Sequence, residues 1–480
     1  MLFSSTIFLF LFLPIVFGVY YVLAFSRLAQ NIWLMLVSIL FYAWGEPINI
    51  LLMLAVVLLN WTAGWLIEKN NNRLKTRRFI MISSCVINLT ILFIFKYLGF
   101  FVNVVNEGAG HPLLPEVVLA LPIGISFFTF QAMSYVLDVY KHSTKAEKNP
   151  FYVGLYIAFF PQLIAGPIVR YASIAEQLHT RKSNINKISM GACRFVVGLG
   201  KKILLANNFA ILADTIFNYS AMGQEMYNVP IMLAWLGAIA YTLQIYFDFS
   251  GYSDMAIGLG LMFGFKFDEN FNYPYAATSL LDFWRKWHIS LTSWFREYVY
   301  FPLGGSRVKN KDIMIRNLFI VWLLTGIWHG ANWTFLFWGL WHFCFQLAER
   351  FFGYGKDNKH PILMHAYTML VVTLGWVMFR AQDLYQAGRY FLNMFGLSNN
   401  GFFSKQALFL MKEYGVFLIL GIVFCAPVAR RINEWLVKSK QGIVNRIITT
   451  AYPFAIVALF YICVSYLARG GYNPFIYFNF

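Results

Sequence analysis

The side chain best suited to acid–base chemistry is His329, which lies between Trp328 and Gly330 in the apolar run "LLTGIWHGANWTFLFWGLWHF". A neutral imidazole can accept a proton from an alcohol, as a general base must. The commoner alternative, on the local sequence alone, is a core histidine hydrogen-bonded to a backbone carbonyl. The glycines around His329 interrupt the helical pattern, however, and this indicates a cavity next to the ring.

A second histidine, His288, lies in "SLLDFWRKWHISLTSWFREYVYFPLGG". Asp282 stands three and four residues before Arg285 and Lys286, the spacing of helix-surface ion pairs. On a continuous helix His288 would share the face of Trp284 rather than the charged face. Such a segment is also typical of an amphipathic helix at a membrane surface with an incidental histidine, and the local sequence favours that alternative.

Two carboxylates, Asp248 and Asp254, lie in "LQIYFDFSGYSDMAIGLG". Six residues correspond to about 600° of helix, so the two side chains do not share a face and are not expected to form a catalytic pair. We expect a structural role, either as partners of Arg285 or another buried cation or as a cap for a break at Gly251. Proton or ion transport stays open as an alternative.

The chain ends in "FIYFNF", an aromatic segment with one phenol in its middle. Phe475, Tyr477 and Phe480 stand in the spacing Phe-x-Tyr-x-x-Phe. Taken alone, such a tail is typical of an aromatic anchor at a membrane interface.

The composition indicates the elements that must position these residues. Of the 480 residues 59% are hydrophobic and 12% charged, whereas soluble domains average about 25% charged residues. Runs of about 20 apolar residues recur throughout, each long enough to cross a bilayer. We therefore expect an all-α, polytopic membrane protein with one integral-membrane domain over 1–480, and no soluble domain.

The net charge of +17 fits cytoplasmic loops rich in Lys and Arg, so the lipid bilayer and not nucleic acid is the expected partner. The five cysteines lack C-x-x-C spacing, which indicates neither a disulfide framework nor a metal site.

Loop charges predict the topology. Basic loops at 68–78, 141–149, 170–187, 306–316 and 429–440 should face the cytoplasm, whereas 102–117 and 217–230, which lack Lys and Arg, should face outward. With about ten crossings, both termini are then extracytoplasmic, including the tail at 470–480. The predicted crossings are 3–25, 32–44, 48–67, 79–101, 117–137, 190–216, 231–262, 361–380, 414–428 and 447–467.

Three further apolar stretches, 151–169, 288–304 and 317–348, would break this charge pattern as single crossings. Proline and glycine interrupt each of them, with breaks expected at Gly326 and at Gly330–Asn332 in the third. Broken backbone at membrane depth is tolerated only where it is buried in protein or lines a cavity. We therefore expect re-entrant or horizontal helices around a central funnel.

Long segments of the chain resemble a known family. "DFWRKWHISLTSWFREYVYFPLGGSR" and "LLTGIWHGANWTFLFWGLWH", with "LPIGISFFTFQAMSYVLDVY", "FFPQLIAGPIVR" and "YFDFSGYSDMAIGLG", are similar to the membrane-bound O-acyltransferases. The resemblance is to the bacterial branch of alginate and peptidoglycan O-acetylation proteins, and it extends over nearly the whole chain. It implies a ring of tilted helices around a funnel, with the family's invariant histidine at His329 and its second polar position at His288.

The resemblance also implies a reaction. In this branch acetyl-CoA is the cytoplasmic acyl donor, no cofactor is bound permanently, and a separate extracytoplasmic SGNH-type O-acetyltransferase places the acetyl group on a polysaccharide such as alginate or peptidoglycan. The expected location is the bacterial inner (cytoplasmic) membrane.

Related machinery that D-alanylates teichoic acids uses a companion peptide whose Phe-x-Tyr-x-x-Phe motif offers its Tyr as acyl carrier. That spacing in this chain predicts that Tyr477 accepts the acetyl group, flanked by Phe475 and Phe480. Two alternatives stay open: D-alanyl transfer to teichoic acid, and a transporter or flippase with a proton path through the histidines and aspartates.

Overall fold

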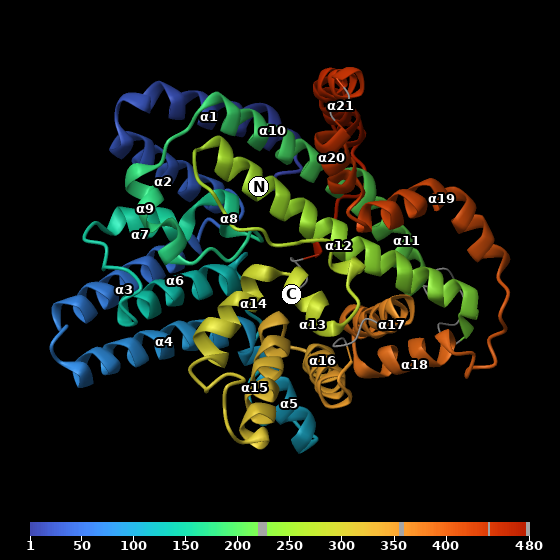
Figure 1. Cartoon of the computed structure of the whole chain (residues 1–480). Coiled ribbons are helices and arrows are strands. Elements are labelled where there is room, and N and C mark those ends of the chain that lie inside the picture. The colour runs from blue at the N-terminus through green and yellow to red at the C-terminus, as the bar shows by residue number, and fades with distance from the viewer. Residues whose placement is uncertain (219–227, 355–359, 440–441, 477–480) are drawn as a thin grey trace. The chain divides into compact units, whose positions relative to one another are not determined.

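The protein is built from helices. The structure is a computed structural model that describes residues 1–218, 228–354, 360–439 and 442–476, and every regular element within them is helical, as Figure 1 shows. This confirms the expected all-α fold. The α-helices are α1 (Leu13–Val22), α2 (Arg27–Ala43), α3 (Ile50–Lys69), α4 (Leu74–Lys96), α5 (Leu98–Ala109), α6 (Ile125–Tyr140), α7 (Pro150–Ala158), α8 (Phe160–Leu163), α9 (Tyr171–Thr180), α10 (Ile185–Gly200), α11 (Asn207–Phe217), α12 (Ile231–Met262), α13 (Leu280–Lys286), α14 (Ile289–Phe295), α15 (Lys311–His329), α16 (Trp333–Phe352), α17 (Pro361–Arg380), α18 (Leu384–Met394), α19 (Lys405–Cys425), α20 (Val428–Ser439) and α21 (Gly442–Ala468). Short π or 3-10 helices are η1 (Phe8–Phe12), η2 (Leu23–Phe25), η3 (Lys201–Ala206), η6 (Pro274–Ala276) and η7 (Arg296–Tyr300).

Several helices are long and apolar enough to cross a membrane. Among the described residues there are 8 such segments, at Phe8–Phe25, Ile50–Lys69, Leu74–Lys96, Ile185–Phe217, Ile231–Met262, Pro361–Arg380, Lys405–Cys425 and Thr450–Ala468. The chain is thus a multi-pass membrane protein. The crossing expected at 32–44 falls on the shorter helix α2, and that expected at 117–137 becomes a helix only from Ile125, after Gly124 with φ 75°.

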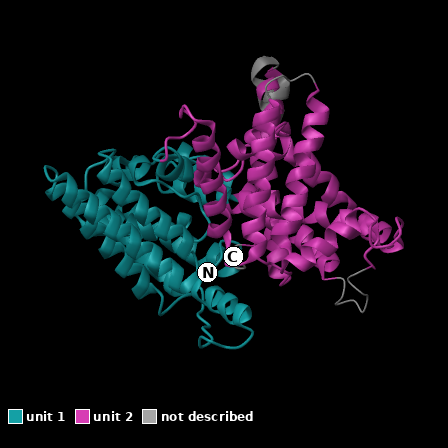
Figure 2. Ribbon diagram, turned by 90° about the horizontal axis from the view of Figure 1, so that it is seen from below, with its two compact units in different colours: residues 1–195, 253–269, 293–302 teal, residues 196–252, 270–292, 303–480 magenta. Residues whose placement is uncertain are grey.

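The chain folds into two compact units, which Figure 2 distinguishes by colour. Unit 1 contains residues Met1–Phe195, Ser253–Glu269 and Ser293–Pro302, and unit 2 contains Val196–Tyr252, Asn270–Thr292 and Leu303–Phe480. In unit 1, α3, α4 and α6 pack against one another, and α2 packs on α7. A buried polar contact joins α3 to α4, because Asn60 and Asn88 donate to each other's carboxamide oxygens at 3.0 and 2.9 Å.

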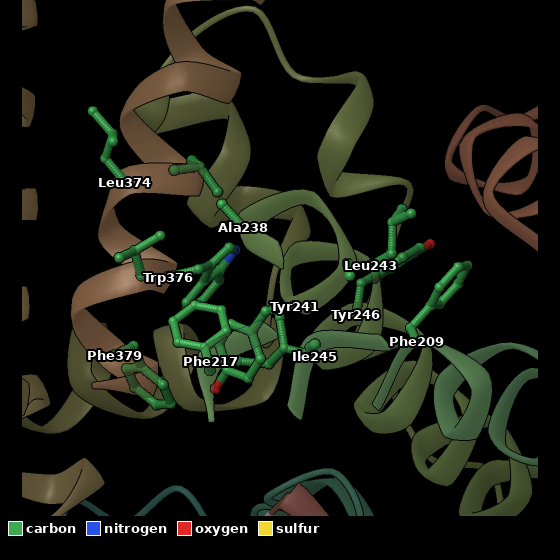
Figure 3. Packing of buried hydrophobic residues seen from close by; sticks show 14 of the residues in the cluster. Phe209, Phe217, Ala238, Tyr241, Leu243, Ile245, Tyr246, Leu374, Trp376 and Phe379 are labelled. Carbon is green, nitrogen blue, oxygen red and sulfur yellow. The ribbon is translucent and has the colours of Figure 1, made fainter. Parts of the chain in front are cut away.

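Unit 2 contains the core that surrounds the predicted histidines. Buried aromatic and aliphatic side chains from α11, α12, α13, α16 and α17 form one continuous cluster. Figure 3 shows Tyr241 of α12 and Trp376 of α17 directed into the same interior space. The rings of Phe283 and Trp287 continue this cluster, with Trp287 4.9 Å from Trp376 between ring centroids. Dense packing of this kind fixes side-chain rotamers around a site.

The stretch predicted at 317–348 is a helical hairpin of α15 and α16, which lie beside each other in yellow and orange in Figure 1. The backbone breaks at Gly330–Asn332, as expected, and Asn332 caps α16 by accepting from Thr334 N at 3.1 Å. The second break, expected at Gly326, was wrong, because Gly326 lies within α15. Its missing side chain instead lets the two backbones approach, since a Cβ there would lie 2.6 Å from Phe335 O.

Gly326→Ala should therefore destabilise the protein. The added methyl group would force α15 away from α16, and overpacking of this kind costs about 1–3 kcal/mol. The melting temperature in detergent should fall. The matched control is Gly388→Ala in α18, where a Cβ meets nothing within 4 Å, and this variant should melt no lower than the parent. Equal melting of both variants would contradict the close backbone contact.

Candidate functional site

His329 is the last residue of α15, and its ring is packed among aromatic side chains. The side chain is 6% exposed. Its ring centroid lies 5.0 Å from those of Trp338 and Phe379, both at steep interplanar angles. Gly330 follows in extended conformation and ends the helix. The imidazole therefore lies at the C-terminal end of a helix, in an apolar environment that largely excludes water.

His288 lies in the link between α13 and α14, and not on one continuous helix as the sequence suggested. Its φ of 42° is in the left-handed region, which is unusual for a residue with a side chain and is concentrated at functional sites. Asn270 stabilises this turn, because its carbonyl oxygen accepts from Ile289 N at 2.9 Å. The expected Asp282–Lys286 pair is confirmed at 2.7 Å and lies on the preceding helix.

The side chain of Asn270 determines which nitrogen of His288 carries the proton. Its Oδ1 accepts from the Ser290 backbone N at 3.2 Å and from Ser290 Oγ at 2.9 Å, so this atom is an oxygen and an acceptor. The same Oδ1 lies 3.2 Å from His288 Nδ1. Nδ1 must then be the protonated nitrogen that donates, and Nε2 keeps the lone pair. Burial lowers the pKa of His288 to about 3, so the ring stays neutral at physiological pH.

The two histidines contact the same indole. The ring of Trp328 lies 6.0 Å from that of His288 and 5.0 Å from that of His329, between centroids. On its other side His288 meets Phe249 of α12 edge to face, at 4.6 Å. The structure thus brings together two side chains that are far apart in the sequence, within unit 2 and beside one aromatic wall.

A third histidine, His342, packs within the aromatic cluster beside the site. It is fully buried on α16, against Trp284 at 4.9 Å and Trp338 at 5.0 Å. Neither ring nitrogen has a hydrogen-bond partner within the described part of the chain. It supports the aromatic wall, because Trp338 also contacts His329.

Asn270→Ala should slow the reaction without weakening binding of the acyl donor. The change leaves the His288 Nδ1–H without its acceptor, so the tautomer is no longer fixed. The cost of about 1–3 kcal/mol corresponds to a roughly 5- to 150-fold lower kcat. KM for the acyl donor should stay unchanged. Asn270→Asp keeps the acceptor oxygen and should retain more of the rate, but the carboxylate should raise the imidazole pKa and shift the pH profile upward. Equal kcat in the parent and Asn270→Ala would contradict the assigned tautomer.

The aromatic tail reaches the interior of unit 2. Phe475 is 4% and Ile476 is 5% exposed, and Ile476 belongs to the same buried cluster as Trp338 and Phe379. A membrane-interface anchor would expose these side chains, so that alternative does not describe this part of the tail. Tyr477 and Phe480 lie outside the described residues. Their roles, like those of the two histidines, stay predictions.

The two aspartates of α12 have separate cationic partners. Asp248 Oδ1 lies 2.6 Å from Lys202 Nζ, and both side chains are buried. Asp254, in unit 1, pairs with Arg194 at 2.8 Å. Lys202 is therefore the buried cation that was expected to pair with Asp248. No break occurs at Gly251, because α12 is continuous; a Cβ there would lie 2.8 Å from Gly198 O.

Sequence reasoning missed Asn270 and Lys202. Asn270 stands in a polar loop, "DENFNYP", that carries no local pattern of its own. Lys202 belongs to "GLGKK", which lacks the frame of a phosphate-binding loop. A signal was available for Lys202, since a lysine between apolar runs needs a buried anion. Among the described residues no group of three or more His, Cys, Asp or Glu side chains could hold a metal ion.

Residues 125–379 match the MBOAT, membrane-bound O-acyltransferase family. The chain is 38% identical, over its full length and the full length of the relative, to a probable alginate O-acetylase AlgI of Pseudomonas putida. It is 43% identical to that of Pseudomonas aeruginosa over 82% of this chain and 75% of the relative. A peptidoglycan O-acetyltransferase of Helicobacter pylori is 34% identical over 89% of this chain and 86% of the relative. The chain therefore belongs to the membrane-bound O-acyltransferase family and is a multi-pass membrane O-acyltransferase.

Proposed function

We propose that this O-acyltransferase takes an acetyl group from cytoplasmic acetyl-CoA, carries it on Tyr477 and passes it to an extracytoplasmic SGNH-type transferase. The final acceptor is a hydroxyl group of a cell-wall or extracellular polysaccharide. One observation carries the proposal: the chain is held up to Ile476 in the buried cluster whose Trp338 and Phe379 rings contact His329. The next residue of the chain is Tyr477.

The proposed step is a transesterification from sulfur to oxygen. His329 takes the proton of the Tyr477 hydroxyl, and the phenolic oxygen attacks the thioester carbonyl carbon. The new C–O bond forms, the C–S bond breaks, and the coenzyme A thiolate leaves with the proton that His329 returns. No oxidant or metal ion enters this balance. A phenol is a weak nucleophile until a base assists it, and the neutral imidazole in an apolar site meets that need.

His288 has a different role in this proposal. With Nδ1 donating to Asn270 Oδ1, its Nε2 can accept a hydrogen bond but cannot donate one to polarise the thioester carbonyl. We therefore propose that His288 Nε2 orients a hydrogen-bond donor such as the incoming hydroxyl group. His329 transfers the proton.

The identity of the final acyl acceptor is inferred from the relatives. Their names specify O-acetylation of alginate in one case and of peptidoglycan in the other, which supports an acetyl group as cargo and a polysaccharide hydroxyl as destination. An aryl ester suits an intermediate carrier, because the phenolate is a better leaving group than an alkoxide. The onward step then needs only a nucleophile from the outer transferase.

Incubation with radiolabelled acetyl-CoA tests the proposal. Purified protein without the outer transferase should retain label on its C-terminal peptide, and alkaline hydroxylamine should release it as expected for an ester. Protein that binds acetyl-CoA and turns it over in the complete system, yet retains no label on that peptide at any time point, would contradict the carrier role.

A further inference from the structure

We propose that the buried Lys202–Asp248 ion pair is the docking site for the chain's own C-terminal tail, and that both side chains are positioning residues for Tyr477. The docking site is inferred from contacts of the described residues. Its purpose rests on the carrier role proposed above.

Both members of the ion pair bind the backbone of the tail. Asp248 Oδ2 accepts from Ile476 N at 2.9 Å. Lys202 Nζ, which lies 2.6 Å from Asp248 Oδ1, donates to Pro474 O. The pair thus contacts one residue on each side of Phe475, and it does so through main-chain atoms.

The side chains of the tail add further contacts. The Phe475 ring lies 5.0 Å from that of Tyr252, between centroids, and Lys202 Nζ is 5.9 Å from the Phe475 centroid. Asn207 Nδ2 donates to Asn473 Oδ1 at 3.3 Å. Tyr472 Oη donates to Asp214 Oδ2 at 2.8 Å, and Asp214 is held by Arg380 at 2.7 Å. Consecutive residues from 472 to 476 are therefore bound in register.

A buried ion pair needs such additional partners. An isolated pair of buried charges gains little, because desolvation offsets the attraction unless the remaining donors and lone pairs are satisfied. Here the tail supplies a carbonyl to the ammonium group and an amide N–H to the carboxylate. The tail and the ion pair therefore stabilise each other.

The docking site is connected to the catalytic region by one residue. Phe249 follows Asp248 on α12 and contacts His288 edge to face at 4.6 Å. Asp248, which binds the tail, and Phe249, which contacts His288, are thus consecutive residues of one helix within unit 2. A tail released from Asp248 would lose its fixed distance from that site.

The test uses the full chain with Lys202→Met and Asp248→Leu combined. Replacing a buried ion pair by apolar groups of similar volume often leaves stability intact, but the tail loses both charged partners. Amide hydrogen exchange of the C-terminal peptide should accelerate at least about tenfold. Acetyl transfer to Tyr477 should fall by at least a similar factor, with KM for acetyl-CoA unchanged. The control is Arg170→Met with Glu297→Leu, an ion pair of unit 1, which should leave exchange of the tail unchanged.

A second variant leaves the ion pair untouched. Ile476→Pro removes the N–H that Asp248 accepts, and it also restrains the backbone and shortens the side chain. Ile476→Val shortens the side chain but keeps the N–H. The proline variant should lose protection and label, whereas the valine variant should keep both. Unchanged tail exchange in the double variant and in Ile476→Pro would overturn the docking site. If the exchange rates respond as expected while Tyr477→Phe still turns over like the parent, the docking site stands and the carrier role fails.

Discussion

His329→Ala should abolish transfer of the acetyl group to the protein. Without the imidazole, the phenol of Tyr477 must lose its proton to water in a site that excludes water, and a general base typically contributes about 10²–10⁴ in rate. Label from acetyl-CoA on the C-terminal peptide should fall by at least about a hundredfold. Because the ring packs against Trp338 and Phe379, a loss of packing must be separated from a loss of chemistry.

His329→Gln provides that separation, since glutamine keeps much of the volume and a polar end but is not a base. It should melt near the parent and remain as inactive as His329→Ala. The matched control is His342→Gln on α16, a residue buried against the same Trp338 ring. If His329→Gln kept parental activity, or if His342→Gln lost as much activity at equal stability, the assignment of His329 as the base would be wrong.

Tyr477→Phe should remove the acyl acceptor itself. The variant keeps the ring and the volume but lacks the oxygen that forms the ester, so no label should appear on the tail. Turnover to the outer acceptor should fall by at least about a thousandfold, as expected for loss of a covalent nucleophile. Binding of acetyl-CoA should be unaffected.

Tyr461→Phe is the matched control, because Tyr461 is a 73% exposed tyrosine of the preceding helix α21. It should label and turn over like the parent. Label that persists on another residue in Tyr477→Phe, together with normal turnover, would indicate a different carrier or direct transfer.

Much of the fold could be predicted from composition and local punctuation. Apolar runs predicted the helices, and Gly330 predicted the break after His329. The error at Gly326 has a physical cause, because a glycine inside a helix marks either a break or a close approach of another backbone, and only the position of α16 decides between them. His288 shows the converse: a regular helical spacing concealed a residue at φ 42°.

The positioning contacts could not be predicted, because they join segments distant in sequence. Asn270 and His288 are 18 residues apart, and Asp248 and Ile476 are 228 apart. The sequence predicted a structural role for Asp248, with Arg285 or another buried cation as one possible partner, but it did not identify Lys202. The tail illustrates the same point: its spacing suggested chemistry, whereas its contacts with Lys202 and Asp248 depend on the tertiary fold.

The central claim is that acetyl-Tyr477 is an obligatory intermediate, and rapid-quench kinetics test it most directly. Labelled acetyl-CoA is mixed with protein and its outer transferase, and the acetylated C-terminal peptide is quantified against time by mass spectrometry. The account predicts that labelled acetyl-Tyr477 appears before the acetylated polysaccharide, at a rate equal to or faster than steady-state turnover. Its label should pass into the polysaccharide when excess unlabelled acetyl-CoA is added. Product that forms before acetyl-Tyr477, or an acetyl-Tyr477 that forms more slowly than turnover, would contradict it.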